Sequence, residues 1–269
     1  MLELLLWTVG IVAAVALGLR LAFGARAAEA WRAVRAVYAK EMRSYAVGPI
    51  PYVLVALVAL VVSWWVFVQQ AWLLMRQAEL ETMFILFPIL FAIIVPALAM
   101  RAWSEEIRGE TVETLMTFPV RVRDVVLGKF LAGLTVLLLC LVATAGVPIT
   151  AASLGNLDMG PVIGGYLGAL LMGGAYLAVG LWLSSMTRNQ IVAFLVGFVA
   201  CFGFSILGWI ASYLGAGPVG DLLSSLSTSN RFRSLGRGVV DLRDAAYFAS
   251  FIAFFLYLNV ESVENRRCR

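Results

Sequence analysis

The chain has 269 residues, of which 62% are hydrophobic and only 13% are charged, and its mean hydropathy is +0.93. This composition excludes a soluble globular domain and requires a bilayer as the solvent, while the net charge of +4 is not gathered into the basic runs that nucleic-acid binding needs. Histidine is absent, which excludes Ser-His-Asp and Cys-His catalysis and His-ligated metal sites.

Two segments precede the first clear membrane span. Residues 1–24 hold an apolar run, Leu4 to Leu19, that is followed by basic residues instead of being preceded by them. We expect an uncleaved extra N-terminal transmembrane helix there, with a signal-like stretch or an upstream extension of a shorter protein as alternatives. Residues 25–49 are predicted to form an interfacial connecting helix, because apolar and basic side chains alternate between two helical faces from Trp31 to Val47.

Uncharged stretches predict six core transmembrane helices within residues 50–265, since a charge at mid-bilayer is costly. We expect them at Tyr52–Val68, Met83–Met100, Phe130–Leu157, Met159–Thr187, Asn189–Gly220 and Ala245–Val260. The third should end near Gly146 and the fifth before Gly215. The fold class is therefore an all-α integral membrane protein. No span has a central ionisable residue, so ion-coupled transport is not expected.

The distribution of Lys and Arg predicts the orientation in the membrane. Fifteen of the 20 basic residues fall on one side, including those of the basic tail 266–269, and that side should be the cytoplasm. The C-terminus is then cytoplasmic, and a bacterial inner membrane is the expected location. Four arginines of the loop before the last span run against this bias. The candidate residues of this outer loop are Arg231, Arg233, Arg237, Asp241, Arg243 and Asp244.

The cytoplasmic connection between the second and third core spans is the most informative segment. Ser104 is predicted to cap a helix of about four turns that ends at Pro119. Glu106, Glu110 and Glu113 would then share one acidic face. Acid/base chemistry or a divalent cation, a solvated helix, and docking of a cytosolic partner are the three interpretations, of which we favour docking.

Two ridges of small residues lie within the predicted spans. The first comprises Gly160, Gly164 and Gly168, and the second comprises Ala193, Gly197, Cys201 and Ser205. Such ridges let helix backbones approach closely. Packing within one subunit is the favoured interpretation, and a moving dimer seam is the alternative.

At the cytoplasmic connection the sequence resembles a known family. The run from Met100 to Val120, followed by Val125 to Ala132, is similar to the permease subunits of type 2 ABC exporters, particularly the GldF-like, gliding-motility branch. The stretches Val37–Pro49 and Asn230–Phe248 resemble the connecting helix and the last outer loop of the same family. The resemblance covers roughly residue 31 to the end.

The resemblance implies a coupling helix, Ser104 to Phe118, seated on a separate cytosolic ABC ATPase. Its contact residues would be Ser104, Glu105, Glu106, Arg108, Gly109, Glu110, Thr111, Glu113 and Thr114. Those of the connecting helix would be Lys40, Glu41, Arg43 and Ser44. The resemblance also implies a second permease copy, as a homodimer or heterodimer, and in some members a GldG-like extracytoplasmic auxiliary protein.

The chain contains no phosphate-binding loop of the form G-x-x-x-x-G-K-[ST]. We therefore expect no enzyme activity and no directly bound cofactor, with ATP and Mg²⁺ held by the partner ATPase. The predicted function is the transmembrane permease of an ATP-driven exporter, for substrate export or the assembly of a surface machine. An integral membrane enzyme acting on lipid is one alternative, and a transporter or scaffold not driven by ATP is the other.

Overall fold

The computed structural model describes residues 29–69, 80–110, 120–154, 157–214, 217–238 and 241–267. Every regular element in these ranges is helical, and six helices are long and apolar enough to cross a membrane. The predicted fold class, an all-α integral membrane protein with six core spans, is confirmed. The predicted N-terminal helix of residues 1–24 and the last two residues of the basic tail lie outside the described ranges.

A helix over residues 29–47 precedes the labelled elements. The others are α2 (Pro49–Trp64), its π-helical extension η1 (Trp65–Gln69), α4 (Glu81–Ala99), α5 (Arg101–Arg108), α7 (Val122–Ala143), α8 (Gly146–Leu154), α9 (Met159–Met186), α10 (Gln190–Leu214), α11 (Pro218–Leu226), α12 (Thr228–Gly236) and α13 (Leu242–Arg267). The predicted breaks are found, because α7 ends at Ala143 before Gly146, and α10 ends at Leu214 before Gly215.

Two features differ from the prediction. The segment expected to be an outer loop before the last span folds into two short helices, α11 and α12. The third core span also begins earlier than expected, since α7 starts at Val122, and Lys129 therefore lies inside a membrane-crossing helix. The uncharged stretch in the sequence begins only after Lys129, so the sequence places this lysine in the cytoplasmic connection.

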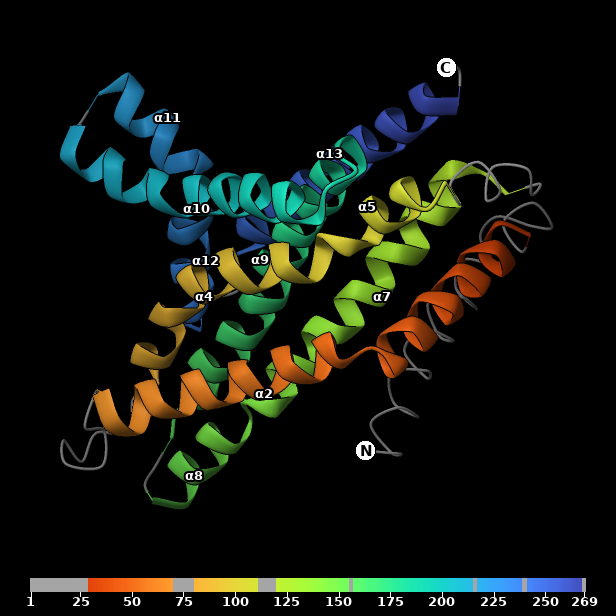
Figure 1. The fold of residues 1–269 in the computed structure, drawn as a ribbon. Coiled ribbons are helices and arrows are strands. Elements are labelled where there is room, and N and C mark those ends of the chain that lie inside the picture. Colours follow the sequence, from red (N-terminus) through yellow and green to blue (C-terminus); the bar gives the residue numbers. More distant parts are fainter. Residues whose placement is uncertain are drawn as a thin grey trace.

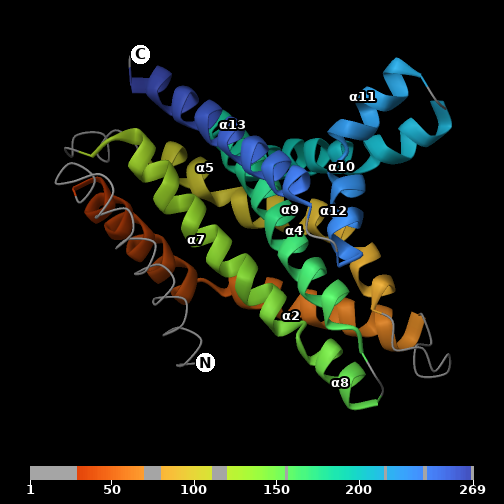
Figure 2. The same ribbon diagram turned by 180° about the vertical axis from the view of Figure 1, so that it is seen from behind.

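Helix α9 runs through the centre of the molecule, with α4 on one side and α13 on the other (Figures 1 and 2). Its inward residues Met172, Tyr176, Leu177 and Leu181 are almost completely buried. By contrast, only about a fifth of the residues in the spans of α2, α10 and α13 are buried within this single chain. In a membrane, lipid tails or another protein would cover the exposed faces of these helices.

The first ridge of small residues brings α12 against α9. A Cβ atom added to Gly164 would lie 2.4 Å from the carbonyl oxygen of Leu235, and one added to Gly168 would lie 3.1 Å from the Leu235 Cβ. In the second ridge, a Cβ on Gly197 would lie 3.1 Å from the Pro96 Cβ of α4. Both ridges thus serve packing within the chain, which was the favoured interpretation.

The segments with the predicted cytoplasmic basic residues converge at one end of the bundle. Lys40 contacts Glu106, Gln190 at the start of α10 donates to Glu105 at 2.9 Å, and Arg266 at the end of α13 donates to the Met186 carbonyl at 2.9 Å. Figure 1 places α5, the C-terminus and helix 29–47 toward the upper right, with α8 at the opposite end. The helices therefore bring together segments that the charge pattern had assigned to one side.

The α9–α12 contact can be tested at Gly164. Because the added methyl group would meet backbone atoms of α12, Gly164→Ala should lower the free energy of unfolding by about 1–3 kcal/mol, despite the better helix propensity of alanine. Thermal unfolding in detergent measures the effect. Gly203→Ala is the matched control, since nothing lies within 4 Å of its added Cβ, and it should leave the melting temperature unchanged or slightly higher. Equal destabilisation by the two variants would contradict the close contact.

Candidate functional site

The elbow, defined here as α5 with the turn residues 109–110, continues almost directly from α4. The joint is Met100, which keeps helical backbone angles (φ −55°, ψ −31°) between Ala99 and Arg101. Ser104 is therefore not the helix cap that the sequence suggested. It lies inside the helix, is fully buried, and its hydroxyl donates to the carbonyl of Met100.

The first turn of the elbow is instead capped by a serine from another helix. The Ser184 Oγ of α9 accepts hydrogen bonds from the backbone N–H groups of Trp103 and Ser104, both at 3.3 Å. The same hydroxyl donates to the Met100 carbonyl at 3.0 Å. N–H groups in the first turn of a helix have no partner within it, so Ser184 satisfies them while fixing the elbow to α9.

A buried ammonium group fixes the elbow to α7. The side chain of Lys129 is 2% exposed, and its Nζ donates to the Ala102 carbonyl at 2.7 Å and to Glu41 Oε1 at 2.8 Å, and pairs with Glu106 Oε1 at 3.0 Å. It also lies 4.9 Å from the centre of the Trp103 ring, a cation–π contact. An ammonium has three N–H donors, so Lys129 is fully satisfied by these three acceptors.

Lys40 completes what we call the charge cluster: Lys40, Glu41, Glu106 and Lys129. Its Nζ lies 2.7 Å from Glu106 Oε1, and two lysines against two glutamates leave the cluster with no net charge. Burial by itself would lower the pKa of Lys40, but its hydrogen bond to Glu106 and the charges of Glu106 and Glu41 raise that pKa overall. The cluster joins helix 29–47, α5 and α7.

The predicted helix is interrupted after Arg108, before the part of it that lies outside the described residues. α5 stops at Arg108, and Glu110 adopts a left-handed backbone conformation with φ 55°. Glu106 and Glu110 consequently do not share one helix face, because the helix that would align them ends between them. Glu106 points inward to the charge cluster, whereas Glu105, Arg108, Gly109 and Glu110 are exposed. Thr111, Glu113 and Thr114 lie outside the described residues.

Helix 29–47 lies against α7 instead of presenting a free apolar face. A Cβ on Gly128 would come within 2.8 Å of the Val37 side chain, and the Tyr38 hydroxyl is 3.2 Å from the Thr135 hydroxyl. Of the predicted contact residues on this helix, Glu41 is buried in the charge cluster, and Lys40, Arg43 and Ser44 are exposed.

Sequence reasoning missed Lys129, Trp103 and Ser184. The one available signal was the position of Lys129 directly before an uncharged run, which indicates a cation at the inner edge of a span. No pattern in the sequence pairs Lys129 with Glu41, because 88 residues separate them. Ser184 carries no motif either, since a hydroxyl supplied by another helix has no sequence spacing.

The outer candidate residues divide into distinct environments. Asp244 is buried and pairs with Arg231 at 3.0 Å, and the Arg231 guanidinium also lies 5.6 Å from the Tyr247 ring. Arg233 lines a cavity between α10, α11 and α12. Arg233 and the remaining three, Arg237, Asp241 and Arg243, are exposed.

Six apolar helices that carry a charged elbow at one end define a multi-pass membrane protein. The sequence matches the family described as ABC-2 family transporter protein over residues 5–258, and the chain belongs to that family. No curated protein matches the chain. Membership makes the chain the membrane component of a transporter, which suggests that it is not itself the ATPase.

The family match corrects one expectation and leaves another open. The resemblance in the sequence was placed from about residue 31 onward, but the match begins at residue 5 and includes most of the first apolar stretch. The match identifies the family and not a branch within it, so membership of the gliding-motility branch stays a prediction.

The charge cluster makes a stability prediction. Lys129→Met leaves Glu41 and Glu106 buried with only Lys40 as a counter-charge, and removing one partner of a buried ion pair costs about 3–5 kcal/mol. Thermal unfolding in detergent should show this loss. Lys40→Met is the matched control: its side chain is 57% exposed, and a surface pair contributes about 0–1 kcal/mol. If both variants shifted the melting temperature equally, Lys129 would not be the centre of the cluster.

Proposed function

We propose that this chain is the permease subunit of an ATP-binding cassette exporter, and that its elbow transmits force from a separate cytosolic ATPase. The observation that carries the proposal is the division of the elbow into two faces. Glu105, Arg108 and Glu110 are exposed at the end of the bundle, while Glu106 and Ser104 are turned inward. The exposed face is accessible to a partner, although Glu105 on it also contacts Gln190 of α10 and Arg101, and the other face is fixed to the transmembrane helices.

The inward face supports a mechanism in which several elements move together. Ser184 ties the elbow to α9, and the charge cluster ties it to α7 and to helix 29–47. Pulling Lys129 away from its carboxylates would leave buried charges without partners, which is strongly unfavourable. A displacement of the elbow would therefore carry these helices along as a body. ATP and Mg²⁺ would be bound by the partner ATPase, and the chain would hold neither.

The convergence of basic segments supports a cytoplasmic position for the elbow, with the C-terminus on the same side and the chain in a bacterial inner membrane. A second permease copy would complete the pathway, and the exposed apolar faces of α2, α10 and α13 offer surface for it. Export or assembly of a surface machine, with a GldG-like auxiliary protein, is the role that the predicted branch implies.

Partner docking is tested by reversing the exposed charges. Glu105→Lys combined with Glu110→Lys should reduce co-purification with a co-expressed cassette ATPase by more than about tenfold, because reversed charges at a complementary surface repel the partner. Glu106 is left unchanged, since it belongs to the charge cluster. Asp241→Lys, an exposed acid at the other end of the bundle, is the matched control and should co-purify normally. Undiminished co-purification of the double variant would contradict docking at the elbow.

Topology is tested with single cysteines in a background lacking Cys140, Cys201 and Cys268. Asp241→Cys should react with a membrane-impermeant maleimide in intact cells. Glu110→Cys should react only after lysis, because the elbow is placed in the cytoplasm. Labelling in the reverse order would remove the elbow from any cytosolic ATPase and end the proposal.

A further inference from the structure

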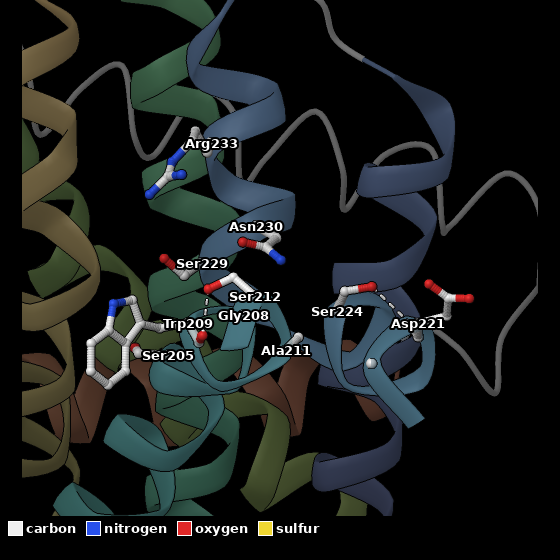
Figure 3. A pocket seen from close by; sticks show the side chains of 11 residues that line it. Ser205, Gly208, Trp209, Ala211, Ser212, Asp221, Ser224, Ser229, Asn230 and Arg233 are labelled. Carbon is white, nitrogen blue, oxygen red and sulfur yellow. Dashed lines mark hydrogen bonds between the residues drawn. The ribbon is translucent and has the colours of Figure 1, made fainter. Parts of the chain in front are cut away.

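A polar cavity of about 490 Å³ lies between α10, α11 and α12 (Figure 3). It is at the end of α10 away from the elbow, since α10 starts beside Glu105 and the cavity is formed by its last turns. Small-molecule sites typically occupy about 300–1,000 Å³, so this cavity has room for a whole polar group and not just a single ion.

Two facing helical stripes build the main part of the cavity. On α10, Ser205, Gly208 and Ser212 follow one another at three- and four-residue spacing and therefore share a face. On α12, Ser229 and Arg233 are four residues apart and face them. The helices meet closely at Gly208, where an added Cβ would lie 2.5 Å from the Asn230 side-chain oxygen. Gly208 thus closes one wall, and the hydroxyl groups line the space.

Arg231, Arg233 and Arg237 differ in whether they are paired with a carboxylate and in whether they line the cavity. The guanidinium of Arg231 is engaged by Asp244, and Arg237 is exposed and is not one of the residues that line the cavity. Arg233 is also exposed, but it lines the cavity, and no residue in the described part of the chain forms an ion pair with it. Its planar fork of N–H donors suits a phosphate or carboxylate.

An apolar surface continues from the same arginine. A second, much smaller cavity beside Arg233 is lined by Phe84, Ile85 and Pro88 of α4. From Ile85, the exposed isoleucines Ile89 and Ile93 follow along α4 at four-residue spacing, each about half exposed. A ligand with its anion at Arg233 would therefore have an apolar path beside it, which favours an amphiphile over a purely polar molecule.

The far end of the cavity favours hydroxyl groups. In Figure 3, Asp221 and Ser224 of α11 lie at the opposite end from Arg233, with the hydroxyl and amide side chains between. A carboxylate accepts hydrogen bonds and repels a second anion. The phosphate is consequently placed at Arg233, and the remainder of the group should carry donors toward Asp221.

We propose that this cavity binds a hydroxyl-bearing phosphate ester, as in the glycerophosphate headgroup of phosphatidylglycerol, with the phosphate at Arg233 and the hydroxyl groups toward the serines and Asp221. The proposal does not depend on the ATPase coupling above, because binding needs no nucleotide. The same chemistry could be presented by a membrane lipid or by a soluble glycerophosphate.

The test uses the full chain in detergent and native mass spectrometry. Phosphatidylglycerol should remain bound to the wild-type chain more strongly than phosphatidylcholine does. Arg233→Gln should weaken phosphatidylglycerol binding about tenfold or more, because charged hydrogen bonds to the phosphate are lost. Arg237→Gln removes the same charge one turn further along and should bind like the wild type. Arg233→Lys, which keeps the charge without the planar fork, should be intermediate, and it provides a second measurement should Arg233→Gln fail to fold.

The outcomes separate the assignment from its alternatives. Equal weakening by Arg233→Gln and Arg237→Gln would overturn the site, because general surface charge would then explain binding. Equal retention of phosphatidylcholine would overturn the role of the hydroxyl groups. Competition with soluble sn-glycerol 3-phosphate distinguishes the two sources: displacement of the lipid at similar concentrations supports a soluble ester, and resistance to displacement supports the lipid.

Discussion

The elbow owes its arrangement to one buried ammonium. Lys129 is held within a membrane-crossing helix, where a charge without partners would be prohibitively unfavourable. Its three N–H groups need three acceptors, and they find them on two other elements: the Ala102 carbonyl and Glu106 of α5, and Glu41 of helix 29–47. The position of the elbow follows from that requirement, because moving either element away would leave Lys129 or a carboxylate unsatisfied.

Helix α9 connects the elbow with the cavity at the opposite end of α10. Near its end, Ser184 caps the first turn of α5. Further back along the same helix, the Tyr176 hydroxyl bonds to Ser205 of the cavity wall and to Thr228 of α12, the latter at 2.7 Å. Polar groups inside a membrane protein bond between helices because no water is available to them. These bonds make α9 a physical link between the proposed site of force input and the proposed ligand site.

Much of the fold was predictable because the bilayer imposes simple rules on composition. Long stretches without charged residues predict all six core spans, and nearby glycine and proline residues predict where α7 and α10 end. The same rule fails at Lys129, because this charged residue lies inside the span and is neutralised by carboxylates from other helices. It failed again at α11 and α12, whose polar residues indicated a loop. α12 is stabilised by Phe232 and Leu235 packing on the glycine ridge of α9, a contact between segments distant in the chain.

The sequence by itself determined the solvent, the number of core spans and the grouping of the basic segments, because each depends on local composition. Only the tertiary structure decided which charged side chains are buried or paired and which are accessible to a ligand or partner. It turned Glu106 inward and left Glu105 exposed, and it paired Arg231 while leaving Arg233 to line a cavity. Sequence spacing cannot distinguish these neighbours, because whether a charge is buried, paired or accessible depends on side chains that come from other helices.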